Sequence, residues 1–188
     1  MTDRERSMHP VVIDACCLID LLASGHAEAI LRACGHAWHI PTAVQVEVKY
    51  VRQHDPAQPG HVVLVEADLS PLLGAGVLTA CQTDNQHESD RFTQYATQFR
   101  SDGEAMCLAL AECRGWPVAT DDRKAIRVAQ QAGLTVFSCP ELVKTWDDRI
   151  HPEQSALIRV LHDIELLAQF RPNPSLPQYQ WWVDQIAS

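Results

Sequence analysis

Short strand-like runs alternate with helical segments along most of the chain, and this alternation constrains its fold more than any other feature. The strand candidates lie at residues 11–13, 38–40, 61–66, 76–79, 117–120 and 134–137. The helical patterns lie at residues 27–34, 41–52, 101–113 and 123–132. Strands that alternate with helices are typical of a parallel sheet covered by helices on both faces. The sequence therefore predicts a three-layer α/β fold with a central, mainly parallel sheet.

The pattern changes after residue 140, where only helical segments follow. Residues 153–170 are amphipathic, and a proline-rich break at residues 171–177 precedes a short helix that carries Trp181 and Trp182. We therefore predict an α/β domain over residues 1–140 and a helical extension over residues 141–188. Two exposed tryptophans would leave a large apolar patch, so the extension is expected to pack on the domain or on a second subunit.

Two aspartates stand directly after strand candidates. Asp14 follows Val-Val-Ile, and Asp121 follows Pro-Val-Ala-Thr. In open parallel sheets, ligands bind outside the carboxyl ends of the strands. Aspartate also caps helices that begin after a strand, so either residue alone would say little. The repetition favours a shared site at one edge of the sheet.

Two glutamates interrupt apolar helical stripes. Glu47 lies within the stripe of Val44 and Val48, and Glu104 lies one turn before Cys107. A carboxylate in such a stripe is costly unless something pairs with it. Because like charges that converge need a cation, the four acids together predict a metal site.

Each glutamate also has a purely structural interpretation. Ser101 and Glu104 have the spacing of a capping box, in which the glutamate reaches back to the serine amide. Glu47 could instead form an ion pair with Lys49 or Arg52. Both interpretations stay open at the level of sequence.

Carboxylate oxygens suit Mg²⁺ or Mn²⁺, and no cysteine or histidine pattern indicates Zn²⁺. The predicted metal ligands are Asp14, Glu104, Asp121 and Asp122, with Asp20 and Asp102 as secondary candidates. Asp122 could alternatively cap the helix that follows it. A divalent ion at Asp14 and Asp121 would lower the pKa of a coordinated water, which could then attack a phosphorus atom.

The formal net charge of −9 argues against a broad basic surface for nucleic acid. Any contact with RNA phosphate must be local, and the candidate residues are Lys49, Arg52, Arg123, Lys124 and Arg127. The alternative is that these side chains form solvated helix faces.

Bulk features also limit the cellular setting. No apolar run approaches the roughly 20 residues that cross a bilayer, and no stretch near residues 1–10 resembles a signal peptide. The seven cysteines lack a C-x-x-C pair and are expected to be reduced and packed as small apolar groups. We therefore expect a cytoplasmic protein that does not span a membrane.

Four segments around the acids share their order with a known nuclease family. They are Val-Val-Ile-Asp14-Ala-Cys-Cys-Leu-Ile-Asp-Leu-Leu, Ile-Pro-Thr-Ala-Val-Gln-Val-Glu47-Val, Asp-Gly-Glu104-Ala-Met-Cys-Leu-Ala-Leu-Ala and Ala-Thr-Asp121-Asp-Arg-Lys-Ala. In this order they resemble the PIN domain family, in particular its VapC-type toxin branch and uncharacterised prokaryotic relatives. The resemblance covers residues 11–139.

The resemblance implies a Mg²⁺- or Mn²⁺-dependent endoribonuclease, the toxin of a toxin–antitoxin pair, that forms a homodimer and binds a cognate antitoxin. The implied catalytic residues are Asp14, Glu47, Glu104 and Asp121. The sequence departs from the family pattern at Cys16, where many members have serine or threonine, and at Glu104, where aspartate is common.

Two other functions fit parts of the pattern. A catalytically inactive or partner-dependent binding module could keep the PIN-like fold, because fold does not fix function. A phosphotransfer enzyme with an aspartyl nucleophile would be expected to carry a second acid two residues after Asp14, where this chain has Cys16. Metal-dependent cleavage discriminates the nuclease from the binding module.

Overall fold

Five parallel strands form the central sheet of the computed structural model, which describes residues 8–187. Their order is β5-β2-β1-β6-β7. The strands are β1 (Pro10–Ile13), β2 (Ala37–Pro41), β5 (Leu78–Cys81), β6 (Val118–Ala119) and β7 (Val136–Phe137). All four pairings are parallel, so the predicted α/β class with a parallel central sheet is confirmed.

The central strand β1 is β-branched and wholly buried at Val11, Val12 and Ile13. Such runs are typical of parallel strands that are covered on both faces. The register pairs Ile13 with Ala119 of β6, so the chain leaves both strands at the same level. The residues that follow, Asp14 and Thr120, therefore meet at one edge of the sheet.

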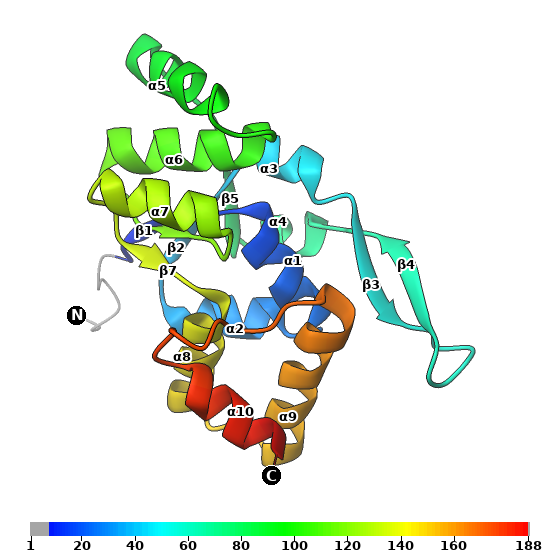
Figure 1. Cartoon of the computed structure of the whole chain (residues 1–188). Coiled ribbons are helices and arrows are strands. Elements are labelled where there is room, and N and C mark those ends of the chain that lie inside the picture. Colours follow the sequence, from blue (N-terminus) through cyan, green and yellow to red (C-terminus); the bar gives the residue numbers. More distant parts are fainter. Residues whose placement is uncertain (1–7, 188) are drawn as a thin grey trace, which may run out of the picture.

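Helices cover both faces of this sheet (Figure 1). On one face lie α6 (Asp102–Arg114) and α7 (Arg123–Gln131), and α5 (Gln86–Ala96) packs on the outside of α6. On the other face lie α1 (Ala15–Ala23), α2 (Ala27–Cys34) and α8 (Cys139–Ile150), with the short α4 (Ser70–Gly74) leading into β5. The flanking helices predicted from the sequence are thus present.

The helix predicted over residues 41–52 is wrong beyond Glu47. Helix α3 (Thr42–Glu47) ends there, and β3 (Tyr50–His54) pairs antiparallel with β4 (Val62–Glu66) in a separate hairpin that projects from the body (Figure 1). The spacing of Val44, Val48 and Val51 continues the helical period, but residues 50–54 follow the period of a strand, in which Val51 is buried and its neighbours are exposed. Pairing with β4 decides between the two periods.

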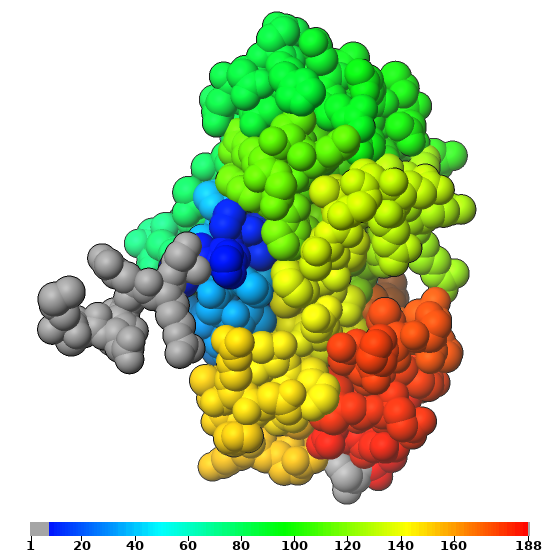
Figure 2. All heavy atoms as spheres, turned by 90° about the vertical axis from the view of Figure 1, so that its left-hand side faces the viewer, coloured from blue at the N-terminus to red at the C-terminus, as the bar shows by residue number. Residues whose placement is uncertain are grey.

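The helical extension consists of α8, α9 (Gln154–Asp163), a π-helical turn η1 (Ile164–Ala168) and α10 (Tyr179–Ala187). Its buried side chains, among them Trp146, Val160 and Trp182, belong to the same apolar cluster as the strands. The indole Nε1 of Trp182 donates to Glu165 Oε1 at 3.0 Å. Figure 2 shows α10 against α8 on this side of the molecule, so the extension packs on the α/β domain of its own chain.

Within residues 8–187, no helix combines the length and the apolar character that a transmembrane span would need.

Replacing Trp182 by alanine is expected to lower the free energy of unfolding by about 3–5 kcal/mol. The substitution leaves a cavity where the fully buried indole was, and it removes the hydrogen bond from the indole to the Glu165 carboxylate. Trp181 is the matched control, since its ring is only partly buried and Trp181→Ala should cost less than about 2 kcal/mol. Urea unfolding monitored by circular dichroism measures both. Equal, small effects would show that the extension does not contribute to the cooperative unit.

Candidate functional site

Asp14 lies at the carboxyl end of β1 and is 2% exposed. Its Oδ1 accepts from the Ala15 amide at 2.7 Å, and its Oδ2 accepts from the Thr120 hydroxyl at 2.8 Å. Burial nevertheless raises the pKa of Asp14 to about 6, and the charge of Glu104 raises it further in the same direction. Asp14 is therefore a buried carboxylate held by neutral donors.

Cys16 and Thr120 connect the two strand-end aspartates. The Cys16 thiol lies 3.3 Å from Asp14 Oδ2 and accepts from the Asp121 amide at 3.3 Å. It also lies 3.4 Å from the Thr120 hydroxyl. Although Cys16 departs from the hydroxyl residue common in the PIN family, Thr120 supplies a hydroxyl to Asp14 from the neighbouring strand.

Asp121 stands two residues beyond β6 and remains partly accessible. Its Oδ2 accepts from the Cys139 amide at 2.9 Å, at the N-terminus of α8. Burial raises the pKa of Asp121 to about 7, and the charge of Asp14 contributes in the same direction. The charge of Asp14 thus reaches the neighbouring strand-end carboxylate of Asp121.

Asp20, a secondary candidate in the sequence, joins this group from α1. Its side chain is 5% exposed, and the described residues offer its carboxylate no hydrogen-bond donor in the observed geometry. Burial, followed by the charge of Asp121, raises the pKa of Asp20 to about 8. Ligand atoms of Asp20, Asp121 and Cys139 all lie within 4.8 Å of one another. The structure therefore brings the predicted candidate Asp20 next to Asp121 and adds Cys139 as a further potential ligand.

Glu47 reaches from α3 to the N-terminus of α6. Its Oε1 accepts from the Gly103 amide at 2.7 Å, and its Oε2 accepts from the Ser101 hydroxyl at 3.0 Å. A carboxylate is favoured at this end of a helix, where unpaired amides and the helix dipole carry partial positive charge. Among the described residues no ion pair joins Glu47 to Lys49 or Arg52.

The Ser101 hydroxyl lies within hydrogen-bond distance of both Glu104 and Glu47, and its single hydrogen is shared between the two carboxylates. The capping box predicted as one alternative for Ser101 and Glu104 is not formed, because Glu104 accepts from the Ser101 hydroxyl instead of the Ser101 amide and the Ser101 side chain makes no capping bond to α6. Glu47 caps the helix instead. Glu104 lies close enough to Asp14 to raise its pKa, which connects the pair of glutamates to the pair of aspartates.

The four predicted acids therefore form one continuous group at the carboxyl edge of the sheet. Asp14 and Asp121 meet through Cys16 and Thr120, Glu104 interacts electrostatically with Asp14, and Glu47 joins Glu104 through Ser101. Within the described part of the chain, none of the four forms an ion pair with lysine or arginine. Carboxylates are the ligands that a hard divalent cation prefers. Among residues 8–187, however, the ligand atoms that lie within 4.8 Å of one another belong to Asp20, Asp121 and Cys139, so no three of the four predicted acids converge on one point in this conformation.

Asp122 caps α7, one of the two roles predicted for it. Its Oδ1 accepts from the amides of Lys124 and Ala125 at 2.9 and 2.8 Å. A role as metal ligand stays a prediction and would have to use Oδ2. Asp102, the other secondary candidate, is exposed at the start of α6.

The five predicted phosphate-binding residues are dispersed over the surface. All five are exposed, with Lys49 after α3, Arg52 on β3, and Arg123, Lys124 and Arg127 on α7. The Lys124 ammonium contacts the Gln98 carbonyl and lies 4.8 Å from the centre of the Phe99 ring. Arg123 lines the same cavity as Asp121, which makes it the one of the five that shares a cavity with a predicted catalytic acid.

The chain matches no protein-family model and no curated protein sequence. The resemblance to PIN domains therefore rests on the four motifs and on the placement of their acids.

Two contributors to the site were missed from the sequence. Thr120 precedes Asp121 by one residue, and its role follows from the register between β1 and β6. Cys139 was expected to be a packing residue, yet its amide binds Asp121 and its thiol lies beside two carboxylates. A Thr-Asp pair that ends a strand beside another strand-end aspartate was the available signal for Thr120.

Gly103→Ala is expected to detach Glu47 from α6 with little change in global stability. The new Cβ would lie 2.3 Å from Glu47 Oε2, so the carboxylate must move. The lost capping bonds should cost about 1 kcal/mol, and replacing glycine by alanine within a helix should return a similar amount. Urea unfolding should then show that the free energy of unfolding changes by less than about 1 kcal/mol. A separate Mn²⁺ titration should show weaker binding than in the wild type. A large loss of stability, or unchanged Mn²⁺ affinity, would contradict this coupling.

In buffer without divalent ions, the free energy of unfolding of Asp20→Asn is expected to increase relative to that of the wild type as pH rises from about 4 to about 8. Burial raises the pKa of Asp20 from 3.8 to about 8, so the folded wild type binds a proton that the unfolded chain has lost. Stability falls with rising pH when the folded state binds more protons, and the asparagine variant lacks this loss. Urea titrations across the pH range measure the difference. The exposed Asp148→Asn is the control, and a pH-independent difference for Asp20→Asn would contradict the expectation.

Proposed function

We propose that this protein is a Mg²⁺- or Mn²⁺-dependent endoribonuclease that hydrolyses phosphodiester bonds of RNA. One observation carries the proposal: Asp14 and Asp121 follow two paired parallel strands at their carboxyl ends, burial raises the pKa of both, and neither has a cationic partner among residues 8–187. Buried acids of this kind are typical of functional sites rather than of structural ion-pair networks.

The predicted ligands suit a hard divalent cation by their chemistry, and Asp121 also lies within 4.8 Å of ligand atoms of Asp20 and Cys139. Asp14, Glu104 and Asp121 offer carboxylate oxygens, which Mg²⁺ and Mn²⁺ prefer. When bound, such an ion would supply Lewis-acid chemistry, acidifying a water and neutralising charge on the phosphate. Because ligands must be deprotonated to bind, the raised pKa values of Asp14 and Asp121 predict that ion affinity increases from pH 6 to pH 8.

The surrounding side chains hold these acids in place. The Thr120 hydroxyl and the Ala15 amide fix both oxygens of Asp14, and the Cys139 amide fixes one oxygen of Asp121. Ser101 fixes Glu104 against the capped end of α6. Functional groups need supporting contacts of this kind, because small displacements lower catalytic efficiency.

RNA as substrate and the toxin role rest on the resemblance to the VapC-type branch of PIN domains. In that role the protein would have a cognate antitoxin and would form a homodimer. Arg123, which shares a cavity with Asp121, is a local cation on a chain of net charge −9. A local contact of this kind is compatible with RNA binding on an acidic protein.

A catalytically inactive or partner-dependent binding module is the second candidate. The observation that favours it is the engagement of both Glu47 oxygens in capping α6, which leaves that residue a structural role without any ion. A protein of this kind would bind Mn²⁺ and cut nothing.

Cleavage of a pool of end-labelled RNAs tests the proposal, with Mg²⁺, Mn²⁺ or EDTA in separate reactions. Asp14→Asn and Asp121→Asn nearly preserve shape and are each expected to lower the rate on the order of 10²-fold or more, because they remove charge from the acidic group. The control is Asp148→Asn, an exposed residue paired with Lys144 on α8.

The possible outcomes separate the two candidates. Cutting that requires a divalent ion and disappears in both aspartate variants would support the nuclease. Cutting that survives EDTA or both variants would refute it. Mn²⁺ binding by the wild type without any cutting would favour the binding module.

A further inference from the structure

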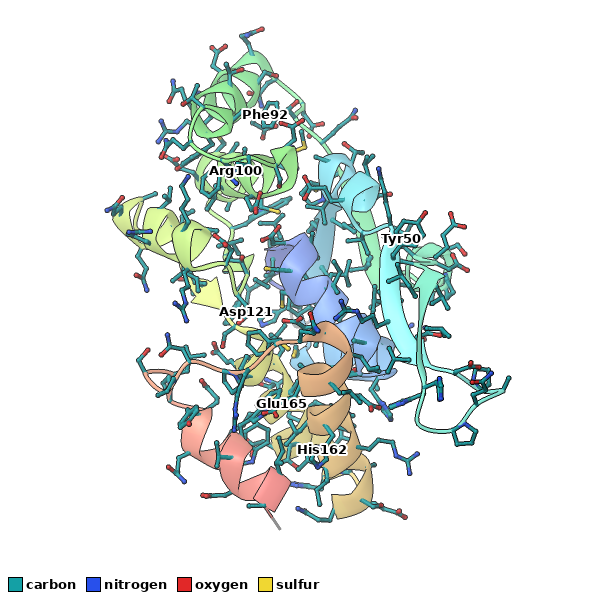
Figure 3. The ribbon with its side chains drawn as sticks, turned by 45° about the vertical axis from the view of Figure 1, so that its right-hand side comes forward. Tyr50, Phe92, Arg100, Asp121, His162 and Glu165 are labelled. Carbon is teal, nitrogen blue, oxygen red and sulfur yellow. The ribbon has the colours of Figure 1, made fainter. Side chains whose placement is uncertain are left out.

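A cavity of about 600 Å³ opens beside Asp121, between the start of α7 and the segment that links η1 to α10. The domain contributes Asp121, Arg123 and Gln130, and the linking segment contributes Gln169, Arg171 and Asn173. Figure 3 shows Asp121 next to this segment, where the extension passes the edge of the sheet. The wall opposite α7 therefore comes from the C-terminal extension.

The cavity carries a local positive charge on an acidic protein. Two arginines and one carboxylate line it, whereas the whole chain has a net charge of −9. Arg123 is exposed and makes no ion pair among the described residues, and Arg171 lies 3.7 Å from Glu165 with its side chain 70% exposed. Both guanidinium groups can therefore turn toward a bound anion.

The remaining lining suits a nucleotide better than a bare anion. The side chains of Gln130 and Gln169 bring amide groups that can donate and accept hydrogen bonds, and Phe170 adds an apolar surface. Ligand sites combine a concave, partly apolar lining with a few polar groups in volumes of roughly 300–1,000 Å³. The cavity falls in this range.

We propose that this cavity is an RNA subsite that holds one nucleotide next to the cleaved bond, with Arg123 and Arg171 binding backbone phosphates. The proposal rests on the ribonuclease activity proposed above and identifies the linking segment as a substrate contact. Arginine binds phosphate oxygens through two parallel hydrogen bonds, and its charge makes binding dependent on salt. Asp121 places the subsite at the predicted catalytic group.

The test measures binding separately from cleavage. A fluorescein-labelled single-stranded RNA of mixed sequence is titrated by anisotropy, in EDTA and at several salt concentrations, against protein that carries Asp14→Asn. Asp14 does not line the cavity, so this background prevents cutting and leaves the subsite unchanged. Arg123→Ala and Arg171→Ala are compared with the controls Arg32→Ala on α2 and Arg159→Ala on α9, which are also exposed, lie outside the cavity and are not among the predicted phosphate-binding residues.

Each of Arg123→Ala and Arg171→Ala is expected to raise Kd about fivefold to tenfold, as for a partly exposed charged hydrogen bond. The slope of log K against log salt should become shallower by about 0.7 per arginine, the value for single strands. Arg171→Lys should keep the slope. The two control variants should change neither quantity.

Unchanged Kd and slope in Arg123→Ala and Arg171→Ala would overturn the subsite, and so would equal losses in the two controls. If the wild type still cuts RNA in that case, only the subsite is refuted and the proposed function stands. A wild type that neither binds nor cuts RNA would overturn both proposals.

Discussion

Burial of aspartates without a cationic partner is the constraint on which the site depends. Asp14, Asp20 and Asp121 lie together, and burial raises the pKa of each. Such burial is costly, and the negative charges add to the cost. The arrangement persists because β1 and β6, which are fully buried and paired in register, fix where the chain leaves the sheet. A bound cation would relieve this cost, so ion binding and folding stability are linked at this edge.

The glutamates are stabilised in a different way from the aspartates. Glu47 receives an amide and a hydroxyl at the start of α6, and Glu104 shares the same hydroxyl. Neutral donors and the helix dipole thus compensate Glu47 without a cation. Gly103 makes this possible, because any side chain there would occupy the space of the carboxylate. Glu47 consequently acts on the site by positioning Ser101 and Glu104.

The sequence was sufficient for the features that depend on local pattern. The parallel sheet and the placement of Asp14 and Asp121 at strand ends followed from short apolar strands that alternate with helices. The prediction failed at residues 48–54, where the valine spacing continues the helical period but pairing with β4 makes residues 50–54 a strand. The contact of Cys139 with Asp121 could not be predicted from the sequence, because it joins two different elements. The contact of Thr120 with Asp14 was indicated only by the Thr-Asp pair at a strand end, and it depends on the register between β1 and β6.

The extension links the core to the surface of the site through one residue. Glu165 Oε1 accepts from the buried Trp182 indole and also lies 3.7 Å from the exposed Arg171. Trp182 is held in the same apolar cluster as the strands, so the backbone near Glu165 is fixed relative to the sheet. The buried packing of Trp182 thereby helps to position the exposed guanidinium of Arg171, which lines the same cavity as Asp121. Loosening the packing of Trp182 should therefore weaken the contacts of Arg171 as well, because Glu165 joins the buried Trp182 to Arg171, which lines the cavity.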